Sequence, residues 1–315
     1  MRRIRKIQAL RFLGPRSAGI ASAGGRAFGR NELGYLTSVL SGDYFFRLAK
    51  HLRINHLVEC GANHAETSRR FVAEGLGTAT AIEANPVTFK QRTSKSLPEG
   101  LTALNMALGK APGDVTLKVP VIDNVVHEGA SSIFSRNETS DYQEFQIKLE
   151  TLDGIERRFE MTRSERLALW IDVEGVALQV LEGAQQLLDS GKVPLIYVEV
   201  ESHRYWDGQH LASAVDSFLS AMNYTPLIRD IQSENQYNLV YVLNDLIDKC
   251  DELTIAYWSD FSNLKATPIS LLKKKASKIK LKLLRFTFTA LLVHLTSALL
   301  GSRSSRSYLL KKFKG

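Results

Sequence analysis

Residues 57–63 read LVECGAN, an apolar run that closes on an acid, a glycine and an asparagine. Residues 65–73 have helical spacing, so a small-residue turn stands between a strand and a helix N-terminus, where the backbone can approach a ligand closely. The next apolar run ends in Glu83, 24 residues after Glu59. An acid at this spacing can accept hydrogen bonds from ribose hydroxyls. The turn has one glycine, so it lacks the three-glycine pyrophosphate fingerprint, which argues against NAD or FAD.

Short apolar runs alternate with amphipathic segments over residues 55–245, and this alternation predicts a mostly parallel sheet with helices on both faces. The last two runs are separated only by residues 232–236, which predicts a hairpin with one antiparallel strand. The predicted fold class is therefore α/β, a doubly wound, Rossmann-like sheet ending in an antiparallel hairpin, as in class I methyltransferases. The apolar runs lie at residues 57–60, 80–83, 101–108, 169–172, 195–200, 225–231 and 237–243.

Residues 111–153 interrupt the alternation. A turn at residues 112–114 precedes an expected strand over residues 115–120, and a second strand is expected over residues 146–149. The polar loop between these strands contains GASS at residues 129–132. An insertion at the ligand edge of a sheet is commonly a substrate loop, but a purely structural hairpin fits this pattern equally well.

The charge is distributed unevenly along the 315 residues, whose formal net charge is +8. Residues 1–30 hold eight Lys and Arg, residues 265–315 hold thirteen, and neither segment holds an acid, so residues 31–264 carry −13. This acidic middle does not favour nucleic-acid binding, and no nucleic-acid partner is expected. Cys60 and Cys250 could form at most one disulfide, which excludes a disulfide-stapled scaffold and suits a reducing compartment.

Both ends favour a membrane surface. The N-terminal segment places apolar residues among arginines and fits a membrane-surface or flexible tail, although its composition also fits an organelle transit peptide. Residues 283–300 read LLRFTFTALLVHLTSALL and have many flanking cations. Polar residues interrupt this run, so an interfacial helix fits better than a spanning anchor or a helix packed on the domain. We expect a cytoplasmic protein, held peripherally on the inner face of an anionic membrane through residues 265–315.

Seven short blocks in order resemble the FkbM family of S-adenosylmethionine-dependent methyltransferases, over about residues 55–245. The most specific block is IDVEG at residues 171–175, followed by VLEGA at residues 180–184. The other blocks are VECGAN at 58–63, IEANP at 82–86, NMALG at 105–109, GASS at 129–132, TLD at 151–153 and VE at 198–199.

The resemblance implies S-adenosylmethionine as the cofactor. It implies that Gly61 and Asn63 line the amino-acid end of this cofactor and that Glu83 binds the ribose. Residues 105–107 would lie near the adenine. The cofactor-binding residues expected from these blocks are Glu59, Gly61, Asn63, Glu83, Asn85, Asn105 and Ala107.

The sequence departs from the family pattern at three positions. Glu59 stands where the family usually has Asp, Ala65 stands where a second glycine is usual, and Ala84 stands where Pro is usual. The acid and the small residues are kept, so the departures are conservative in role, but they bear on the affinity for the cofactor.

Candidate catalytic residues follow the fourth and fifth strands of the predicted sheet, because ligands bind beyond the carboxyl ends of such strands. Asp172 is expected to orient the acceptor or accept its proton, with Glu174 beside it. His203 is the preferred histidine, since an unshifted imidazole titrates near neutrality, although a surface loop position fits it as well. Asp172, Glu174 and His203 do not have a recognised metal-binding spacing, so no metal is expected.

The sequence therefore predicts a methyltransferase domain over residues 31–248. It is flanked by a basic N-terminal extension, residues 1–30, and a basic, partly apolar helical extension, residues 249–315. The expected reaction is O-methylation of a sugar hydroxyl on a glycan, glycolipid or related metabolite, as the resemblance implies. A catalytically silent domain tethered at a membrane as a partner in glycan assembly is the alternative. A nucleic-acid methyltransferase is the third reading, which the acidic middle disfavours.

Overall fold

The computed structural model describes residues 30–137, 139–159, 166–230 and 235–262. The chain divides into two compact units, one of which holds Phe45–Arg229 and Glu234–Cys250 and the other Met1–Tyr44, Asp230–Ser233 and Asp251–Gly315. The predictions for residues 1–29 and 263–315, including the interfacial helix over residues 283–300, lie outside the described residues. Within the part of the chain that is described, no helix has the length and apolar character needed to cross a membrane.

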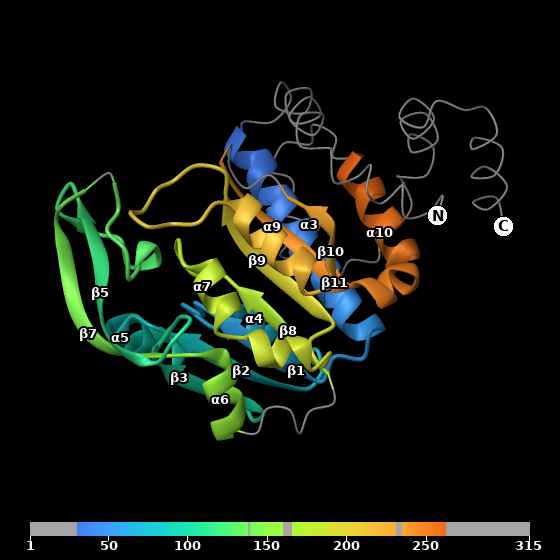
Figure 1. Cartoon of the computed structure of the whole chain (residues 1–315), viewed down its shortest axis with the longest axis horizontal. Helices are drawn as coiled ribbons and strands as arrows, with labels where there is room; N and C mark the ends of the chain where they lie inside the picture. The colour runs from blue at the N-terminus through green and yellow to red at the C-terminus, as the bar shows by residue number, and fades with distance from the viewer. Residues whose placement is uncertain (1–29, 138, 160–165, 231–234, 263–315) are drawn as a thin grey trace, which may run out of the picture. The chain divides into compact units, whose positions relative to one another are not determined.

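The larger unit is built on a sheet that has seven strands among the described residues (Figure 1). Strands β1, β2, β3, β8 and β9 run parallel, and β11 lies antiparallel between β9 and β10. The order β10-β11-β9-β8-β1-β2-β3 places β1 beside β8, and the chain crosses between these strands from one half of the sheet to the other. These strands span His56–Cys60 (β1), Thr78–Glu83 (β2), Leu101–Asn105 (β3), Leu167–Ile171 (β8), Leu195–Glu201 (β9), Tyr224–Arg229 (β10) and Gln236–Leu243 (β11).

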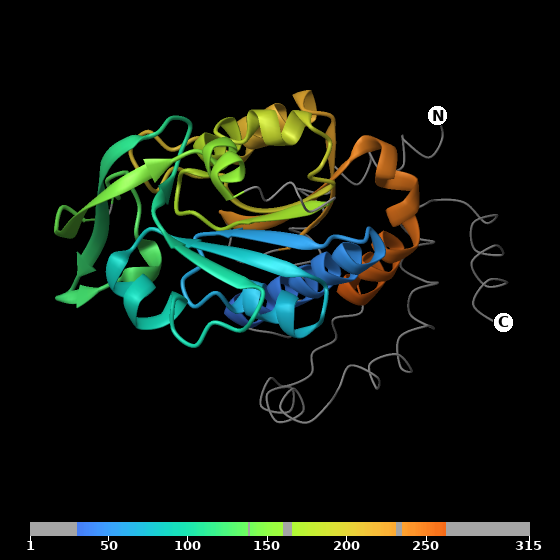
Figure 2. The ribbon, with the colours of Figure 1, turned by 90° about the horizontal axis from the view of Figure 1, so that it is seen from below.

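Helices cover both faces of this sheet, which explains why its central strands are apolar runs rather than alternating patterns. Every residue of β1 and of β9 is buried. Figure 2 shows α4 on one face and α7 and α9 on the other. The helices of this unit include α4 (Glu66–Ala73), α5 (Pro86–Thr88), the π-helix η1 (Phe89–Thr93), α6 (Leu152–Phe159), α7 (Ala177–Glu182), α8 (Gln185–Asp189) and α9 (Ala212–Ala221). The α/β fold class predicted from the alternation is confirmed.

The apolar run at residues 101–108 was predicted as one strand, and this prediction is wrong. The run divides at Met106, whose N–H donates to Glu83 O at 3.2 Å. Residues before this point form β3, whereas Ala107–Leu108 form β4, which pairs with β7 in a second sheet. Both halves are apolar because each half is packed in a different sheet, so hydropathy carries no signal of the break.

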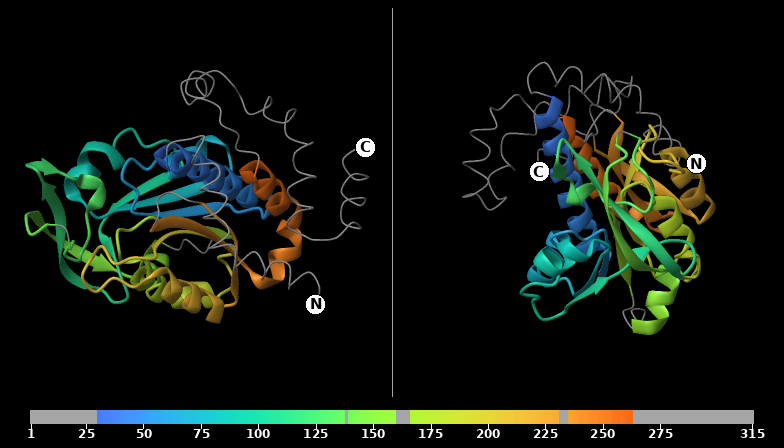
Figure 3. Two further views of the ribbon diagram at one scale, coloured as in Figure 1. Left: turned by 90° about the horizontal axis from the view of Figure 1, so that it is seen from above. Right: turned by 90° about the vertical axis from the view of Figure 1, so that its left-hand side faces the viewer.

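The insertion over residues 111–153 adds β5, β6 and β7 to β4 and so completes that second sheet, in the order β4-β7-β5-β6. Its long ribbon pairs β5 (Gly113–Ile122) with β7 (Tyr142–Glu150), and β6 (Val125–Val126) folds back on β5. The ribbon lies at one end of the first sheet (Figure 3). The loop that follows β6 contains η2 (Glu128–Ala130) and the GASS segment. The insertion is therefore both a structural hairpin and a carrier of this loop.

A break also divides the helical segment over residues 176–190, which follows β8. The segment forms α7 and α8, separated at Gly183 and Ala184. A Cβ at Gly183 would lie 2.1 Å from Gly109 O, so glycine allows the two backbones to touch. The carboxylate of Asp153 then accepts from the N–H groups of Gln186 and Leu187 and caps α8.

The smaller unit contains the first part of α3 (Arg30–His51) and most of α10 (Ile247–Ser262), which follows the 3₁₀ turn η4 (Asn244–Leu246). Within it, the Tyr44 hydroxyl is hydrogen-bonded to Thr254 Oγ1 at 2.6 Å, and the Tyr44 ring lies 5.2 Å from that of Tyr257. The Ser41 hydroxyl donates to Asp230 Oδ2 at 3.1 Å. Side chains of this unit therefore join α3, Asp230 and α10.

Candidate functional site

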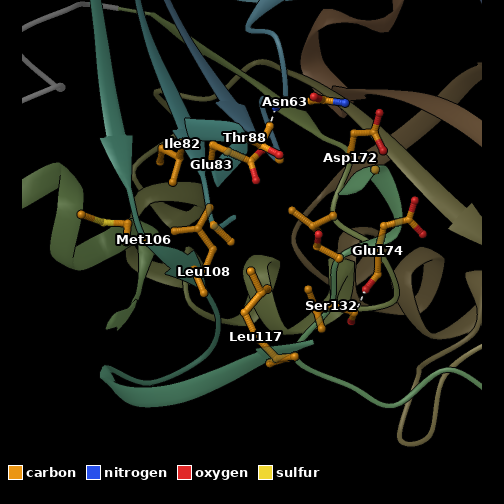
Figure 4. Close-up of a pocket in the computed structure, with 18 of the residues that line it drawn as sticks. Asn63, Ile82, Glu83, Thr88, Met106, Leu108, Leu117, Ser132, Asp172 and Glu174 are labelled. Atoms are coloured by element: carbon orange, nitrogen blue, oxygen red, sulfur yellow. Dashed lines mark hydrogen bonds between the residues drawn. The ribbon is translucent and has the colours of Figure 1, made fainter. Parts of the chain in front are cut away.

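A cavity of about 120 Å³ lies beyond the carboxyl ends of β1, β2 and β8, the edge at which parallel α/β sheets bind their ligands (Figure 4). One side is polar and includes Asn63, Glu83 and Asp172. Ile82, Leu108 and other apolar side chains form another side. A wall of the cavity comes from the GASS loop of the insertion.

The turn after β1 brings three chain segments together. Gly61 has φ +80°, and a Cβ there would lie 1.8 Å from the Asp172 carbonyl oxygen after β8. The N–H groups of Gly61 and Ala62 both donate to Ile82 O at 2.9 Å, which ties the turn to β2. Only glycine fits this contact, because a side chain would push the end of β8 away.

Glu83 at the end of β2 is held by backbone groups. Its two carboxylate oxygens accept from the N–H groups of Asn63 and Asn85, each at 2.7 Å. Burial raises the pKa of Glu83, these two hydrogen bonds oppose the rise, and the charge of Asp172 adds to it. A carboxylate has about four acceptor positions, so part of this capacity remains for a ligand such as a ribose diol.

Three other residues that were predicted to bind the cofactor lie behind the turns that form the cavity. Glu59 accepts from the N–H groups of Thr67 and Ser68 at the start of α4, and burial raises its pKa to about 7. The Asn85 side chain caps α5. The Asn105 amide donates to Glu83 O at 2.8 Å. The structure places the other four, Gly61, Asn63, Glu83 and Ala107, in the lining.

The GASS loop closes the cavity on the side of the insertion. Ser132 Oγ donates to Glu174 O at 2.6 Å, which ties this loop to the segment after β8. The Asn85 amide donates to Ser131 Oγ at 3.2 Å, and Arg92 pairs with Glu128 at 2.9 Å. The loop therefore contacts both halves of the sheet edge. A loop at the ligand edge was one of the two readings of the insertion, and residues of GASS do line the cavity, although none of them was singled out as a site residue.

Four acids gather where β8 and β9 end. Asp172 and Glu174 line the cavity, and Glu199 and Glu201 are buried behind them. Oxygen atoms of Glu174, Glu199 and Glu201 lie within 4.8 Å of one another, close enough to share a hard divalent cation. The amides of Gln236 and Gln209 donate to Glu199 and Glu201, respectively, each at 2.7 Å.

Burial raises the pKa of each buried acid in this group. The pKa of Glu201 rises to about 7, with the Gln209 hydrogen bond opposing the rise and the charge of Asp172 adding to it. The pKa values of Glu174 and Glu199 rise as well, first through burial and then through the charges of the neighbouring acids, while Arg136 lowers that of Glu174. Burial therefore favours the protonated forms of Glu174, Glu199 and Glu201.

His203 lies away from this group, on an exposed loop after β9. Its ring meets the edge of the Tyr205 ring at 5.5 Å. The buried Trp206 ring of the same loop packs on Gly175, and the Arg136 guanidinium lies 5.2 Å from its centre. The structure thus brings Asp172 and Glu174 together at the cavity and places the third predicted catalytic residue outside its lining.

The cavity has the features that a nucleoside ligand such as S-adenosylmethionine requires. Gly61 has no side chain, so a ligand can approach the backbone of the turn closely. Glu83 retains acceptor positions for hydroxyl groups. Two buried polar atoms in the lining, Asn63 Oδ1 and Thr88 Oγ1, have no hydrogen-bond partner among the described residues. Apolar side chains, among them Met106 and Leu117, provide a surface for a base. The residues present therefore fit this cofactor.

Comparisons with solved structures return methyltransferases at low similarity. Magnesium protoporphyrin IX methyltransferase from Synechocystis PCC 6803, with bound SAM, is 8% identical over 67% of this chain and 80% of that one, with a TM-score of 0.38. The 1,6-didemethyltoxoflavin-N1-methyltransferase of Burkholderia thailandensis, with bound S-adenosylhomocysteine, is 10% identical over 76% and 90%, with a TM-score of 0.35. Similarities at this level carry no functional argument. No curated protein matches the chain.

A match to a family model is decisive instead. The model of the methyltransferase FkbM domain matches residues 59–226, from the acid in β1 into β10. This range is more than half of the 315 residues and includes the cavity, the insertion and the four acids. The protein therefore belongs to the FkbM family of methyltransferases.

Proposed function

We propose that this protein transfers a methyl group from S-adenosylmethionine to a sugar hydroxyl of a glycan, glycolipid or related metabolite. The observation that carries the proposal is one cavity that contains both Glu83, with acceptor positions for a ribose, and the exposed carboxylate of Asp172. The bound cofactor supplies an activated methyl group on a positively charged sulfur. Family membership supports the reaction class, and the acid-rich edge supports an acceptor that carries hydroxyl groups.

Gly61, Asn63 and Glu83 would hold the cofactor, and Ala107 would lie against it. Because Gly61 N–H and Asn63 N–H are already bonded to Ile82 O and Glu83, the turn is rigid before a ligand arrives. Such rigidity holds reacting groups in place, and positioning provides much of the rate in a two-substrate transfer.

Asp172 is the residue placed to receive the proton of an acceptor hydroxyl or to orient that hydroxyl. It is exposed within the lining, and its N–H donates to Cys60 O at 2.9 Å, which fixes the backbone beside the cofactor turn. Glu174 has a raised pKa and retains a proton near neutral pH, so it would donate a hydrogen bond to an acceptor oxygen. The two acids would therefore contact the acceptor in different ways.

Calorimetric titration of the full-length protein with S-adenosylmethionine and S-adenosylhomocysteine tests the cofactor. Saturable binding is expected, and Glu83→Ala should weaken it at least tenfold, with circular dichroism showing that the variant is folded. The exposed Glu144 on β7 provides the control Glu144→Ala, which should bind like wild type. Absence of binding by folded wild type would contradict the proposal and favour a catalytically silent domain.

Methyl transfer from radiolabelled S-adenosylmethionine to a panel of sugar alcohols, glycans and glycolipids tests the acceptor. We expect label in an ether methyl group of a sugar, and Asp172→Asn should lower kcat by at least about a hundredfold if it accepts the proton. Label found only on nitrogen, carbon or carboxylate would exclude O-methylation of a sugar.

We also propose that residues 265–315 bind an anionic membrane surface, on the basis of thirteen cations, no acids and an interrupted apolar run. Co-sedimentation with vesicles of phosphatidylglycerol and phosphatidylcholine should capture the full-length protein and release it at high salt. A form ending at residue 264 should stay in the supernatant. Equal behaviour of both forms would refute this role.

A further inference from the structure

Thr88 has a buried hydroxyl with unused hydrogen-bonding capacity in the described part of the chain. Its side chain is 2% exposed, and Oγ1 has no hydrogen-bond partner among the described residues. A buried hydroxyl without a partner destabilises a fold, so such groups normally find one. Thr88 is on the last turn of α5, where its N–H is already bonded to Asn85 Oδ1 at 3.3 Å.

The position of Thr88 indicates what the missing partner is. Thr88 lines the same cavity as Glu83, and Figure 4 shows both side chains on the polar side of that cavity. Nearby buried hydroxyls are bonded within the protein: Thr93 Oγ1 donates to Asn63 O, and Thr80 Oγ1 is paired with His56 Nε2. Buried hydroxyls of Ser38 and Ser68 also lack a partner among the described residues, but neither serine lines the cavity. The other hydroxyls in the lining are satisfied, because Ser131 Oγ donates to Glu128 O and Ser132 Oγ donates to Glu174 O.

We propose that Thr88 is a cofactor-binding residue whose hydroxyl is hydrogen-bonded to the nucleoside part of S-adenosylmethionine. This inference rests on the proposed function, because it takes S-adenosylmethionine as the ligand. A threonine hydroxyl can donate or accept, so it suits a ribose hydroxyl or a ring nitrogen of the base. Neither composition nor the motif blocks pointed to Thr88, since it follows the IEANP block.

Replacement of Thr88 by valine keeps the shape and removes the hydroxyl, and it should have two opposite effects. The ligand-free protein should melt about 2–4 °C higher, because the variant no longer buries an unpartnered group. Affinity for S-adenosylhomocysteine should fall about tenfold, because the hydrogen bond to the ligand is lost. Thr88→Ser retains a hydroxyl and should restore the affinity to within about twofold.

Thr80→Val is the matched control. Thr80 is also buried, on β2, but its hydroxyl is paired with His56. This variant should melt lower than wild type and bind S-adenosylhomocysteine unchanged, which is the reverse of the pattern expected for Thr88→Val. Differential scanning fluorimetry without ligand and calorimetric titration with S-adenosylhomocysteine measure both effects on the full chain.

The outcomes separate this inference from the proposed function. Wild-type binding with a tenfold loss in Thr88→Val and a higher melting temperature supports the inference. Wild-type binding that Thr88→Val leaves unchanged overturns the inference and leaves the proposed function intact. A lower melting temperature in Thr88→Val also overturns it, because the hydroxyl would then have a structural partner. Absence of wild-type binding overturns both.

Discussion

Glu83 and Glu201 are both buried carboxylates at the carboxyl end of a strand, one on each side of the cavity edge, but they are held in different ways. Glu83, at the end of β2, is 7% exposed and accepts from two backbone N–H groups. Glu201, at the end of β9, is 4% exposed, accepts from the Gln209 side chain and has three acids nearby.

In the proposed function, this difference separates a proposed cofactor side, held by backbone groups, from a proposed acceptor side, held by side chains. Backbone groups cannot be exchanged by substitution, so the geometry around Glu83 depends on which residues allow the turn. Side chains can be exchanged by substitution, so the contacts around Glu201 can change while the backbone of β9 stays the same. We infer that the cofactor side is the rigid half of the site and that the acceptor side determines specificity.

Gly61→Ala should have the largest effect, because it disrupts the backbone of the turn after β1 directly. The added Cβ would lie 1.8 Å from Asp172 O at a φ of +80°. We expect the free energy of unfolding to fall by more than about 3 kcal/mol and binding of S-adenosylhomocysteine to be lost. Chemical denaturation and calorimetry measure these effects. Gly113→Ala, where nothing lies within 4 Å of the added Cβ, is the control and should be near neutral.

Glu201→Gln tests the side of the site that is held by side chains, through the pH dependence of the free energy of unfolding. The pKa of Glu201 in the folded protein is about 7, against an ordinary value of 4.5, so the folded state binds more protons than the unfolded state between these values. The stability it contributes is therefore present below pH 4.5 and is lost as pH rises through 7. Between pH 4.5 and 8, wild type should lose about 1–3 kcal/mol more than the variant.

Urea denaturation at both pH values measures that difference. Glu144→Gln, an exposed change on β7, should follow wild type at each pH. If Glu201→Gln shows the same pH dependence as wild type, the acceptor side does not retain the proton assigned to it, and the contrast with Glu83 weakens.

Ala65→Gly sharpens the comparison on the backbone side. Ala65 is in the left-handed region, with φ 54° and ψ 36°, immediately before α4. This conformation costs alanine about 1–2 kcal/mol, and glycine adopts it without that strain but with a larger loss of entropy. A net gain of about 0.5 kcal/mol is expected, measured by denaturation. The exposed Ala73 in the last turn of α4 offers the opposite control, since Ala73→Gly should destabilise.

Arg92→Ala should have the smallest effect. The ion pair with Glu128 is 2.9 Å long, and its side chains are 36% and 24% exposed. Pairs of this kind contribute below about 1 kcal/mol, so thermal melts should differ little. If the melting temperatures of Arg92→Ala and wild type differ strongly at low salt, the position of the GASS loop depends on this ion pair. The loop between the two sides of the site would then be more rigid than we infer.

Local pattern was sufficient to predict the strands of the first sheet and the turn after β1. Apolar runs alternate with helical segments because a parallel sheet is covered by helices on both faces. The stretch LVECGAN contains Gly61, which the close approach of the Asp172 carbonyl oxygen requires. The break at Met106 was missed because apolar residues continue across it. The sequence also could not show that Glu59, Asn85 and Asn105 lie behind the turns. The same polar residue types bind ligands at some positions and backbone groups at others.

The order of elements and the chemistry at each strand end were determined by the sequence alone, since these properties depend on neighbours in the chain. Tertiary structure decided which side chains meet. It placed Glu199 and Glu201 behind Glu174 and left His203 exposed on its loop. It also buried Thr88 at the cavity, with no hydroxyl partner among the residues that the structure describes. These outcomes depend on contacts between segments far apart in sequence, whose register and burial no local pattern records.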